Sequence, residues 1–440
     1  MATDSSTLAD MPASRSAGSP AGTVQRLLIG PRGVILALVA VLMLAAANLA
    51  WLNPSPESEV YRTLDRVPVF WQYSVDAGLE VMTAAYFPEY FHKYNIRISR
   101  PAYPAIVRTL GEGIGLLARP VVKLDPVMKA GLGFVAWNAL FALVSSWCAF
   151  RIFARFLTVP YALFGVALML FHWETVLGTA MFHTTASEYF TPVLIAYLAL
   201  ALGDTFTYRR TILFSLLVGI MMLAKTNYAA YLAVLAVAVL YLRLVPAAVS
   251  FAVHLVPLGL WLLFLRSEGL AYYNHEVEYY GQGQAFARAL THFDVPTLAT
   301  MVRIGTVDTL RYGLVFFNVL LPFAALGGWA LRRRLGLPAW LFLAMFVAAV
   351  VVEISAAELA RLVSDLKFAI CGLAAAGVAE IAARLPALRR PVALSAVAGI
   401  WLLGNLAHLV HLPWVSPYQQ PVHSWSGKDA AFEQEFLTPP

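Results

Sequence analysis

The sequence predicts an all-α protein, a polytopic bundle of transmembrane helices, and two observations support that prediction. The 440 residues are 60% hydrophobic and only 13% charged, whereas about a quarter of the residues in a soluble domain are charged. Apolar runs long enough to cross a bilayer recur along the whole chain. Its charges are scattered through loops, which argues against a nucleic-acid partner. Cys148 and Cys371 lie inside apolar runs and indicate neither a disulfide framework nor a metal site.

Hydropathy along the chain predicts about eleven spans in one transmembrane domain, residues 33–412. The spans are expected near 33–52, 130–150, 156–172, 188–203, 211–224, 228–243, 246–265, 311–330, 338–354, 367–383 and 391–412. Residues 1–32 are small, polar and rich in Ala, Ser and Pro, so we expect a disordered cytoplasmic tail. The first apolar run begins too late for a signal peptide, so the first span is expected to remain as an anchor.

The basic residues of the short loops predict the orientation of the spans. The arginines placed inside are Arg15, Arg26, Arg32, Arg151, Arg155, Arg209, Arg210, Arg243, Arg332, Arg333, Arg334, Arg384, Arg389 and Arg390. The N-terminus is then cytoplasmic, and the C-terminal tail, 413–440, is extracytoplasmic. Two long loops, 53–129 and 266–310, face outside. We expect a multi-pass protein of a bacterial inner membrane whose polar side chains gather on the outer face.

The first outer loop combines acidic residues with a stiff basic stretch. Its carboxylates are Glu57, Glu59, Asp65, Asp76, Glu80, Glu89, Glu112 and Asp125. Asp76 and Glu80 are four residues apart and share a face if "VDAGLEVMTAAYF" is helical. Two neighbouring acids can split their pKa values, which leaves one ionised as a base. Solvated loop charges are the plainer interpretation of any one of these acids.

The sequence "RISRPAYPAIVR", residues 97–108, is called here the arginine–proline segment. Apolar residues at helical spacing follow its prolines, and they predict a helix lying in the membrane interface. Proline is tolerated in a first helical turn and disfavours helix just before it, so the prolines should fix where that helix begins.

Four segments between residues 33 and 245 together resemble the GT-C superfamily of polyprenyl-phosphate-sugar-dependent glycosyltransferases. "DAGLEVMTAAYF" is similar to its Asp-x-x-x-Tyr-x-x-x-Ala segment, with Asp76 in the acid position and Glu80 where an aromatic is usual. "SRPAYPAIVRTLG" is similar to its Arg-Pro-x-Tyr-Pro segment. "TTASEYFTPVLIAYLALAL" resembles the span that opens with a Ser/Thr–Glu pair, here at Glu188. "LLVGIMMLAKTNYAAYL" resembles the Gly-rich span that ends in a basic residue, here Lys225.

The resemblance implies an enzyme, a hexosyl- or pentosyltransferase with its site on the outer face. The donor is a sugar on a polyprenyl phosphate, and the acceptor is a hydroxyl of a glycan, lipid or protein. An inverting displacement needs one carboxylate to accept the acceptor proton. Asp76 is the first candidate for this base. The fallbacks, in falling order, are Glu80, Asp65, Glu59 and Glu57.

Cations are needed to stabilise the departing lipid phosphate. Lys225 is the first candidate, although a lysine there can simply reach for the lipid headgroups. Arg361 is the second; it shares a helical face with Glu358 and Asp365, so a structural ion-pair set is the alternative. Arg100 of the arginine–proline segment is the third.

A divalent cation is possible, because two histidines and two glutamates fall at the outer ends of the third and fourth spans. They are His172, Glu174, His183 and Glu188. Their spacing matches no known metal site, so ordinary interfacial polar residues are the favoured interpretation. The aromatic outer loop 266–310 could cover the site and shape the acceptor pocket, or act as a mobile lid.

Two further functional classes stay open. A transporter or flippase of lipid-linked sugars would need a polar stripe through several spans or inverted repeats with paired helix breaks. The spans carry little mid-membrane charge, and the two halves show no matching breaks. A membrane scaffold protein would need none of the outer acids.

Overall fold

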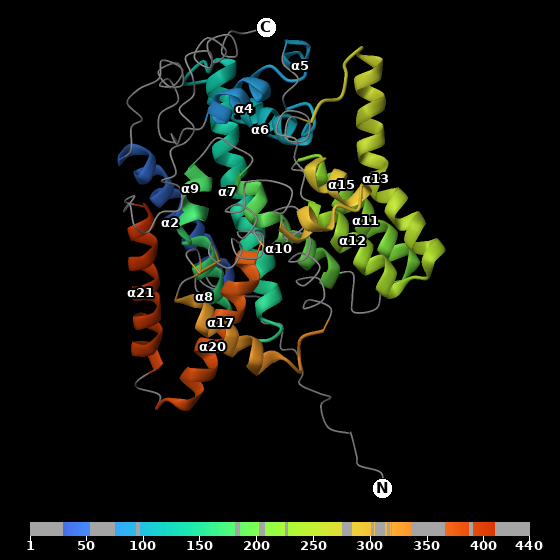
Figure 1. The fold of residues 1–440 in the computed structure, drawn as a ribbon. Coiled ribbons are helices and arrows are strands. Elements are labelled where there is room, and N and C mark those ends of the chain that lie inside the picture. Colours follow the sequence, from blue (N-terminus) through green and yellow to red (C-terminus); the bar gives the residue numbers. More distant parts are fainter. Residues whose placement is uncertain are drawn as a thin grey trace, which may run out of the picture.

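A computed structural model describes most of the chain, and every regular element in the described part is a helix (Figure 1). The described residues are 30–52, 75–93, 97–180, 185–201, 207–224, 228–274, 284–300, 303, 313–314, 317, 319–336, 366–386 and 390–409. The predicted all-α class is confirmed for these residues.

Described helices overlap the predicted spans other than 338–354, and short helices lie between residues 75 and 118 of the loop that was predicted to face outside. The first half contains α2 (Pro31–Leu52), α4 (Val75–Ala85), α5 (Tyr90–Lys93), α6 (Ala102–Ala118), α7 (Pro126–Phe153), α8 (Val159–Leu170), α9 (Trp173–Ala180) and α10 (Thr185–Ala201). The second half contains α11 (Tyr208–Met222), α12 (Tyr228–Tyr241), α13 (Leu244–Ser267), α15 (Gln284–Thr291), α17 (Leu320–Leu331), α20 (Lys367–Arg384) and α21 (Arg390–Leu409).

Two described helices, α7 and α13, are long and apolar enough to cross a membrane. Shorter apolar helices include Val159–Leu170 and Leu320–Leu331. The 28 residues of α7 extend about 42 Å at 1.5 Å per residue, which exceeds the roughly 30 Å of a hydrocarbon core. The length and apolar composition of α7 and α13 fit membrane-spanning helices. The count of about eleven spans stays a prediction, and the span expected at 338–354 lies outside the described residues.

Helix α6 packs antiparallel to the first half of α7. Tyr103 lies beside Phe134 with ring centroids 5.5 Å apart, the carbonyl of Val107 faces Gly133, and Gly111 faces the carbonyl of Lys129. Partner numbers on α7 fall as numbers on α6 rise, so the two helices run in opposite directions. Of the apolar residues that predicted an interfacial helix, Val107 is buried in this contact, whereas Leu117 is 84% exposed. The place of α6 in the interface stays a prediction.

Close backbone contacts at glycines join other helix pairs in the same manner. Gly327 of α17 faces the carbonyl of Leu373, and Gly377 of α20 faces the carbonyl of Phe323. Gly219 of α11 faces a carbonyl of α13. Small residues at helix contacts are typical of membrane bundles, where packing rather than the hydrophobic effect drives association. The arrangement places α4, α5 and α6 at one end of α7, with the end of α20 at the opposite end (Figure 1).

Candidate active site

Helix α4 carries the two acids that the sequence analysis paired. Asp76 falls in its first turn, and Glu80 follows one turn later on the same helix. Residues 79–85 of this helix are all buried. The predicted helical spacing is therefore confirmed for the backbone, while the side chain of Asp76 lies outside what the structure describes. The fallback acids Asp65, Glu59 and Glu57 also lie outside the described residues.

Glu80 is enclosed by side chains of the arginine–proline segment. Its Oε1 lies 3.2 Å from Nε of Arg97, and the two side chains are only 1% and 5% exposed. The negative charge of the same carboxylate also acts on the phenol of the buried Tyr103. Burial raises the pKa of the Tyr103 phenol well above its ordinary value, and the negative charge of Glu80 raises this pKa further. An acceptor hydroxyl can reach Glu80 only by displacing these groups.

The arginine–proline segment bonds to helices far along the sequence. Arg100 N–H donates to the carbonyl of Arg97 at 3.0 Å, which closes a turn. The indole Nε1 of Trp261 in α13 donates to the carbonyl of Ile98 at 2.7 Å. Ala102 N–H donates to the carbonyl of Leu223, just past the end of α11, at 3.1 Å. The turn is therefore held by both α11 and α13.

The same segment also fixes the connection between α4 and α5. Arg108 donates to the carbonyl of Phe87 and lies 3.6 Å from Oε2 of Glu89. Phe91 of α5 packs in a small apolar cluster with Ile98 and Leu265. Three outer elements, α4, α5 and the start of α6, thus form one packed unit at this end of the bundle.

Two of the three predicted phosphate ligands belong to chain segments that this unit joins. Arg100 is 6% exposed and lies two residues before Ala102. Lys225 follows Leu223 by two residues in the sequence, although Lys225 itself lies outside the described residues. The hydrogen bond between Ala102 and Leu223 brings these two segments together. Arg361 also lies outside the described residues.

A small cavity of about 20 Å³ lies beneath the arginine–proline segment. It is lined by Ser99, Gly219, Met222, Leu223, His254, Leu258 and Tyr272. A cavity of this size accommodates about one water molecule. The buried Ser99 hydroxyl has no hydrogen-bond partner within the described part of the chain, so a water bound there would satisfy it.

Lys367 is a buried cation that the sequence analysis missed. It is the first residue of α20, is 1% exposed, and its Nζ donates to Oγ1 of Thr175 in α9 at 2.9 Å. The predicted topology places it at the outer end of α20. The sequence analysis chose Arg361 from this region. The available signal was a lysine followed directly by an apolar run, "KFAICGLAAAGVA".

The possible divalent-cation set has only one described side chain. His172 is fully buried, with ring centroids 5.3 Å from Trp401 and 5.8 Å from Phe317. His183 and the side chains of Glu174 and Glu188 lie outside the description. Among the described residues, no three His, Cys, Asp or Glu side chains gather closely enough to hold a metal ion. The divalent cation therefore stays a prediction.

Comparison with known proteins gives structural neighbours only, since no family model and no curated protein sequence matches this chain. Three of the neighbours are crystal structures of the oligosaccharyltransferase of Archaeoglobus fulgidus. The apo form is 11% identical with a TM-score of 0.48, covering 92% of this chain and 60% of that one. The form tethered to an acceptor peptide with the NVT sequon is 13% identical, with a TM-score of 0.47, covering 92% and 59%.

The third crystal structure is a complex with zinc and sulfate, again 13% identical with a TM-score of 0.47, covering 92% of this chain and 57% of that one. This chain thus spans less than two thirds of the length of the protein that it matches.

Proposed function

We propose that this chain is a glycosyltransferase of a bacterial inner membrane that works on the extracytoplasmic face. It moves a hexose or pentose from a polyprenyl-phosphate donor to a hydroxyl of a glycan, lipid or protein acceptor. One observation carries the proposal: segments from three parts of the chain meet at one end of the bundle. Glu80 on α4 pairs with Arg97, and Ala102 bonds to Leu223.

Each of these three segments carries one proposed catalytic function. The first turn of α4 holds Asp76, the proposed base, and the turn before α6 holds Arg100. The residues that follow α11 include Lys225. A carboxylate and two cations on joined segments are what transfer from a lipid phosphate requires.

The proposed reaction is a single inverting displacement. The acceptor oxygen attacks the anomeric carbon of the sugar while the bond from that carbon to the phosphate oxygen breaks. Asp76 takes the acceptor proton as the new bond forms. Arg100, Lys225 and Arg361 stabilise the negative charge that gathers on the departing phosphate. The products are the glycosylated acceptor and polyprenyl phosphate, whose tail stays in the lipid.

Transfer assays on the purified protein in lipid nanodiscs test this proposal. The probes are polyprenyl phosphates carrying a ¹⁴C-labelled hexose or pentose, with a membrane extract as the source of acceptors. Wild type should transfer the label and release polyprenyl phosphate. Asp76→Asn should lower transfer by about 10²- to 10⁴-fold, because general base catalysis is lost. The matched control is Glu89→Gln, which alters an acid of the same loop that is 66% exposed and should keep wild-type transfer.

Two outcomes would contradict parts of the proposal. Full transfer by Asp76→Asn would remove Asp76 as the base. Wild-type protein that transfers no label from any donor, but moves labelled lipid between leaflets of a vesicle, would establish a flippase instead.

A further inference from the structure

Glu80 stands at the position where the resembled motif has an aromatic residue, one turn after Asp76. An aromatic there would pack without a charge. Glu80 instead buries a carboxylate at 1% exposure, among neighbours on α4 that are themselves buried. A buried carboxylate is costly unless it is paired and hydrogen-bonded. The substitution therefore requires compensation from elsewhere in the chain.

The arginine–proline segment supplies a buried cation beside this carboxylate. Arg97 is itself 5% exposed and places Nε 3.2 Å from Oε1 of Glu80. Tyr103 packs against Phe134 and Trp137 of α7, with ring centroids 5.5 Å and 6.0 Å away. Tyr103 also belongs to one buried apolar cluster with Val81 and Ala84 of α4. Helix α4 thus contacts the turn at residues 97–100 through Glu80 and Arg97, and the start of α6 through Tyr103.

We propose that Glu80, Arg97 and Tyr103 form a clamp that sets the position of α4, and that Glu80 is a positioning residue rather than the base. This inference rests on the proposed function, because it concerns the helix that carries Asp76. The clamp connects α4 to a turn that α11 and α13 also hold, through Ala102–Leu223 and Trp261–Ile98. The first turn of α4 is thereby fixed relative to the segments that carry the proposed phosphate ligands.

Glu89, a second acid in the same loop, remains exposed although it too has an arginine partner. Glu89 also has an arginine partner, Arg108 at 3.6 Å, yet these side chains are 66% and 38% exposed. Glu89 and Glu80 therefore form a matched pair. They have the same chemistry and the same partner type, and they lie nine residues apart, but only Glu80 is enclosed at a helix contact.

The pH profile of transfer separates a positioning role from a catalytic one. Glu80→Gln keeps the shape of the side chain and loses its charge. The clamp predicts that kcat falls by about 10- to 100-fold, because a charge-assisted contact is weakened and α4 shifts. The KM for the polyprenyl-phosphate sugar should stay within about twofold, and the acid limb of the profile should remain, because Asp76 still titrates. Loss of the acid limb in Glu80→Gln would overturn the inference and make Glu80 the base. Glu89→Gln is the control.

A double variant tests the compensation directly. Arg97→Leu alone leaves Glu80 buried without its ion-pair partner, and Glu80→Tyr alone removes the carboxylate beside Arg97. Each single change should lower transfer by about 100-fold. The double variant Glu80→Tyr with Arg97→Leu places an aromatic at the motif position and removes both charges. Its transfer rate should therefore be at least about tenfold higher than that of either single variant. Losses that multiply in the double variant would overturn the clamp. Arg97→Lys, which keeps the charge, should fall between wild type and Arg97→Leu.

Amide hydrogen exchange tests the clamp independently of catalysis. Amide protection of residues 79–85 should fall in Arg97→Leu and in Glu80→Tyr and should recover in the double variant. If wild type transfers no sugar, the proposed function fails, yet this pattern still shows the clamp. If wild type transfers sugar while protection of α4 is equal in all variants, the clamp alone is overturned.

Discussion

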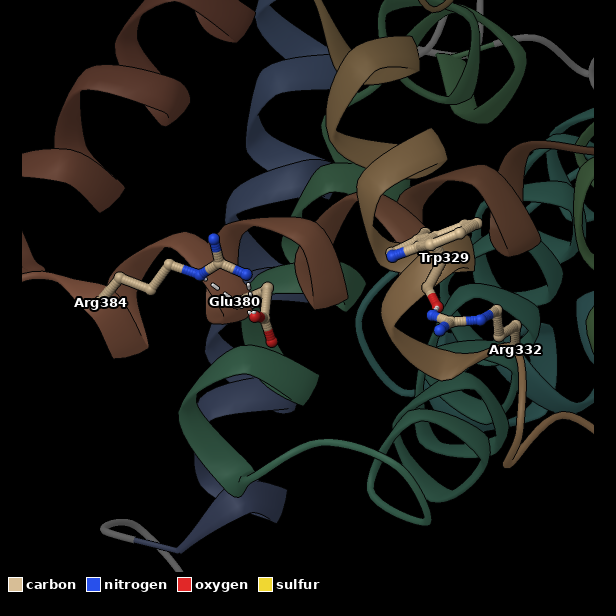
Figure 2. A network of polar contacts seen from close by, with 4 residues as sticks. All are labelled: Trp329, Arg332, Glu380 and Arg384. Atoms are coloured by element: carbon tan, nitrogen blue, oxygen red, sulfur yellow. Dashed lines mark hydrogen bonds and ion pairs between the residues drawn. The ribbon is translucent and has the colours of Figure 1, made fainter.

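Two of the Glu–Arg pairs that the structure describes lie at opposite ends of the bundle, and they differ in distance and in exposure to solvent. Glu80 and Arg97 at the proposed active end are 3.2 Å apart and only 1% and 5% exposed. Glu380 and Arg384 on α20 are closer, at 2.8 Å, but are 38% and 74% exposed (Figure 2). An exposed pair contributes little, because water and salt screen it. A buried pair becomes indispensable once formed, because removing one partner leaves an uncompensated charge. Distance alone would rank the two pairs wrongly.

The two ends also differ in the sequence range of their contacts. At the end shown in Figure 2, Arg384 pairs with a residue four positions earlier, and Arg332 stacks on Trp329, three positions earlier, at 3.9 Å from the ring centroid. At the proposed active end, the indole N–H of Trp261 donates to the carbonyl of Ile98, and the N–H of Ala102 donates to the carbonyl of Leu223. Local pairs arise from helix geometry alone, whereas the long-range bonds exist only in the folded bundle.

The largest effect is expected from Arg97→Ala. It leaves the Glu80 carboxylate buried without its ion-pair partner, which typically costs about 3–5 kcal/mol. The free energy of unfolding can be measured by SDS titration in mixed micelles. Arg384→Ala is the matched control and should cost less than about 1 kcal/mol, as exposed pairs do. Equal losses in the two variants would show that burial does not separate the two pairs.

The next largest loss in the free energy of unfolding is expected where α6 packs on α7. This contact holds Tyr103 of the clamp against Phe134. A Cβ at Gly133 would overlap the backbone carbonyl of Val107. Gly133→Ala must therefore push the helices apart, and it should destabilise the protein by about 1–3 kcal/mol. Gly113 lies on α6 with open space at its Cβ position, so Gly113→Ala should stabilise by about 0.5–1 kcal/mol. A neutral Gly133→Ala in the same titration would contradict the close contact.

The sequence predicted local features of this site well and long-range ones poorly. The four-residue spacing of Asp76 and Glu80 placed them on one helix, because helical period is a local property. The prolines of the arginine–proline segment also predicted where the following helix, α6, begins. Nothing local indicated that Arg97, rather than Arg100 or Arg108, would face Glu80. That choice depends on the turn at residues 97–100 and on its bonds to α11 and α13.

Lys367 shows the same limit for burial. Sequence analysis named Arg361 from this region, with a structural ion-pair set with Glu358 and Asp365 as the alternative. Lys367 is 1% exposed and donates a hydrogen bond to Thr175 of α9, a residue almost two hundred positions earlier. Such a contact exists only in the folded bundle, so composition near residue 367 could not reveal it.

A smaller, pH-dependent effect is expected at Tyr103. Burial first, and then the charge of Glu80, raise the pKa of this phenol above 10.0. In the unfolded chain the phenol loses its proton near pH 10, while the folded protein keeps it. Its contribution to stability is therefore fully present below pH 10 and is lost as the pH rises toward the folded-state pKa. Tyr103→Phe should flatten the alkaline part of a stability–pH curve. An unchanged slope above pH 10 would show that Tyr103 is not what titrates.

The smallest loss in the free energy of unfolding is expected from Glu380→Gln, which removes the acid of the exposed pair on α20. The pair spans one helical turn with the acid first, the favourable order for an i,i+4 pair. Arg384 also ends α20, where a positive charge interacts well with the helix dipole even without Glu380. The loss should therefore be about 0.3–0.5 kcal/mol and should shrink further at high salt. The same titration at low and high ionic strength measures it. A loss that approaches that of Arg97→Ala and persists in high salt would mean that Glu380 is shielded from solvent, and the contrast between the two ends would disappear.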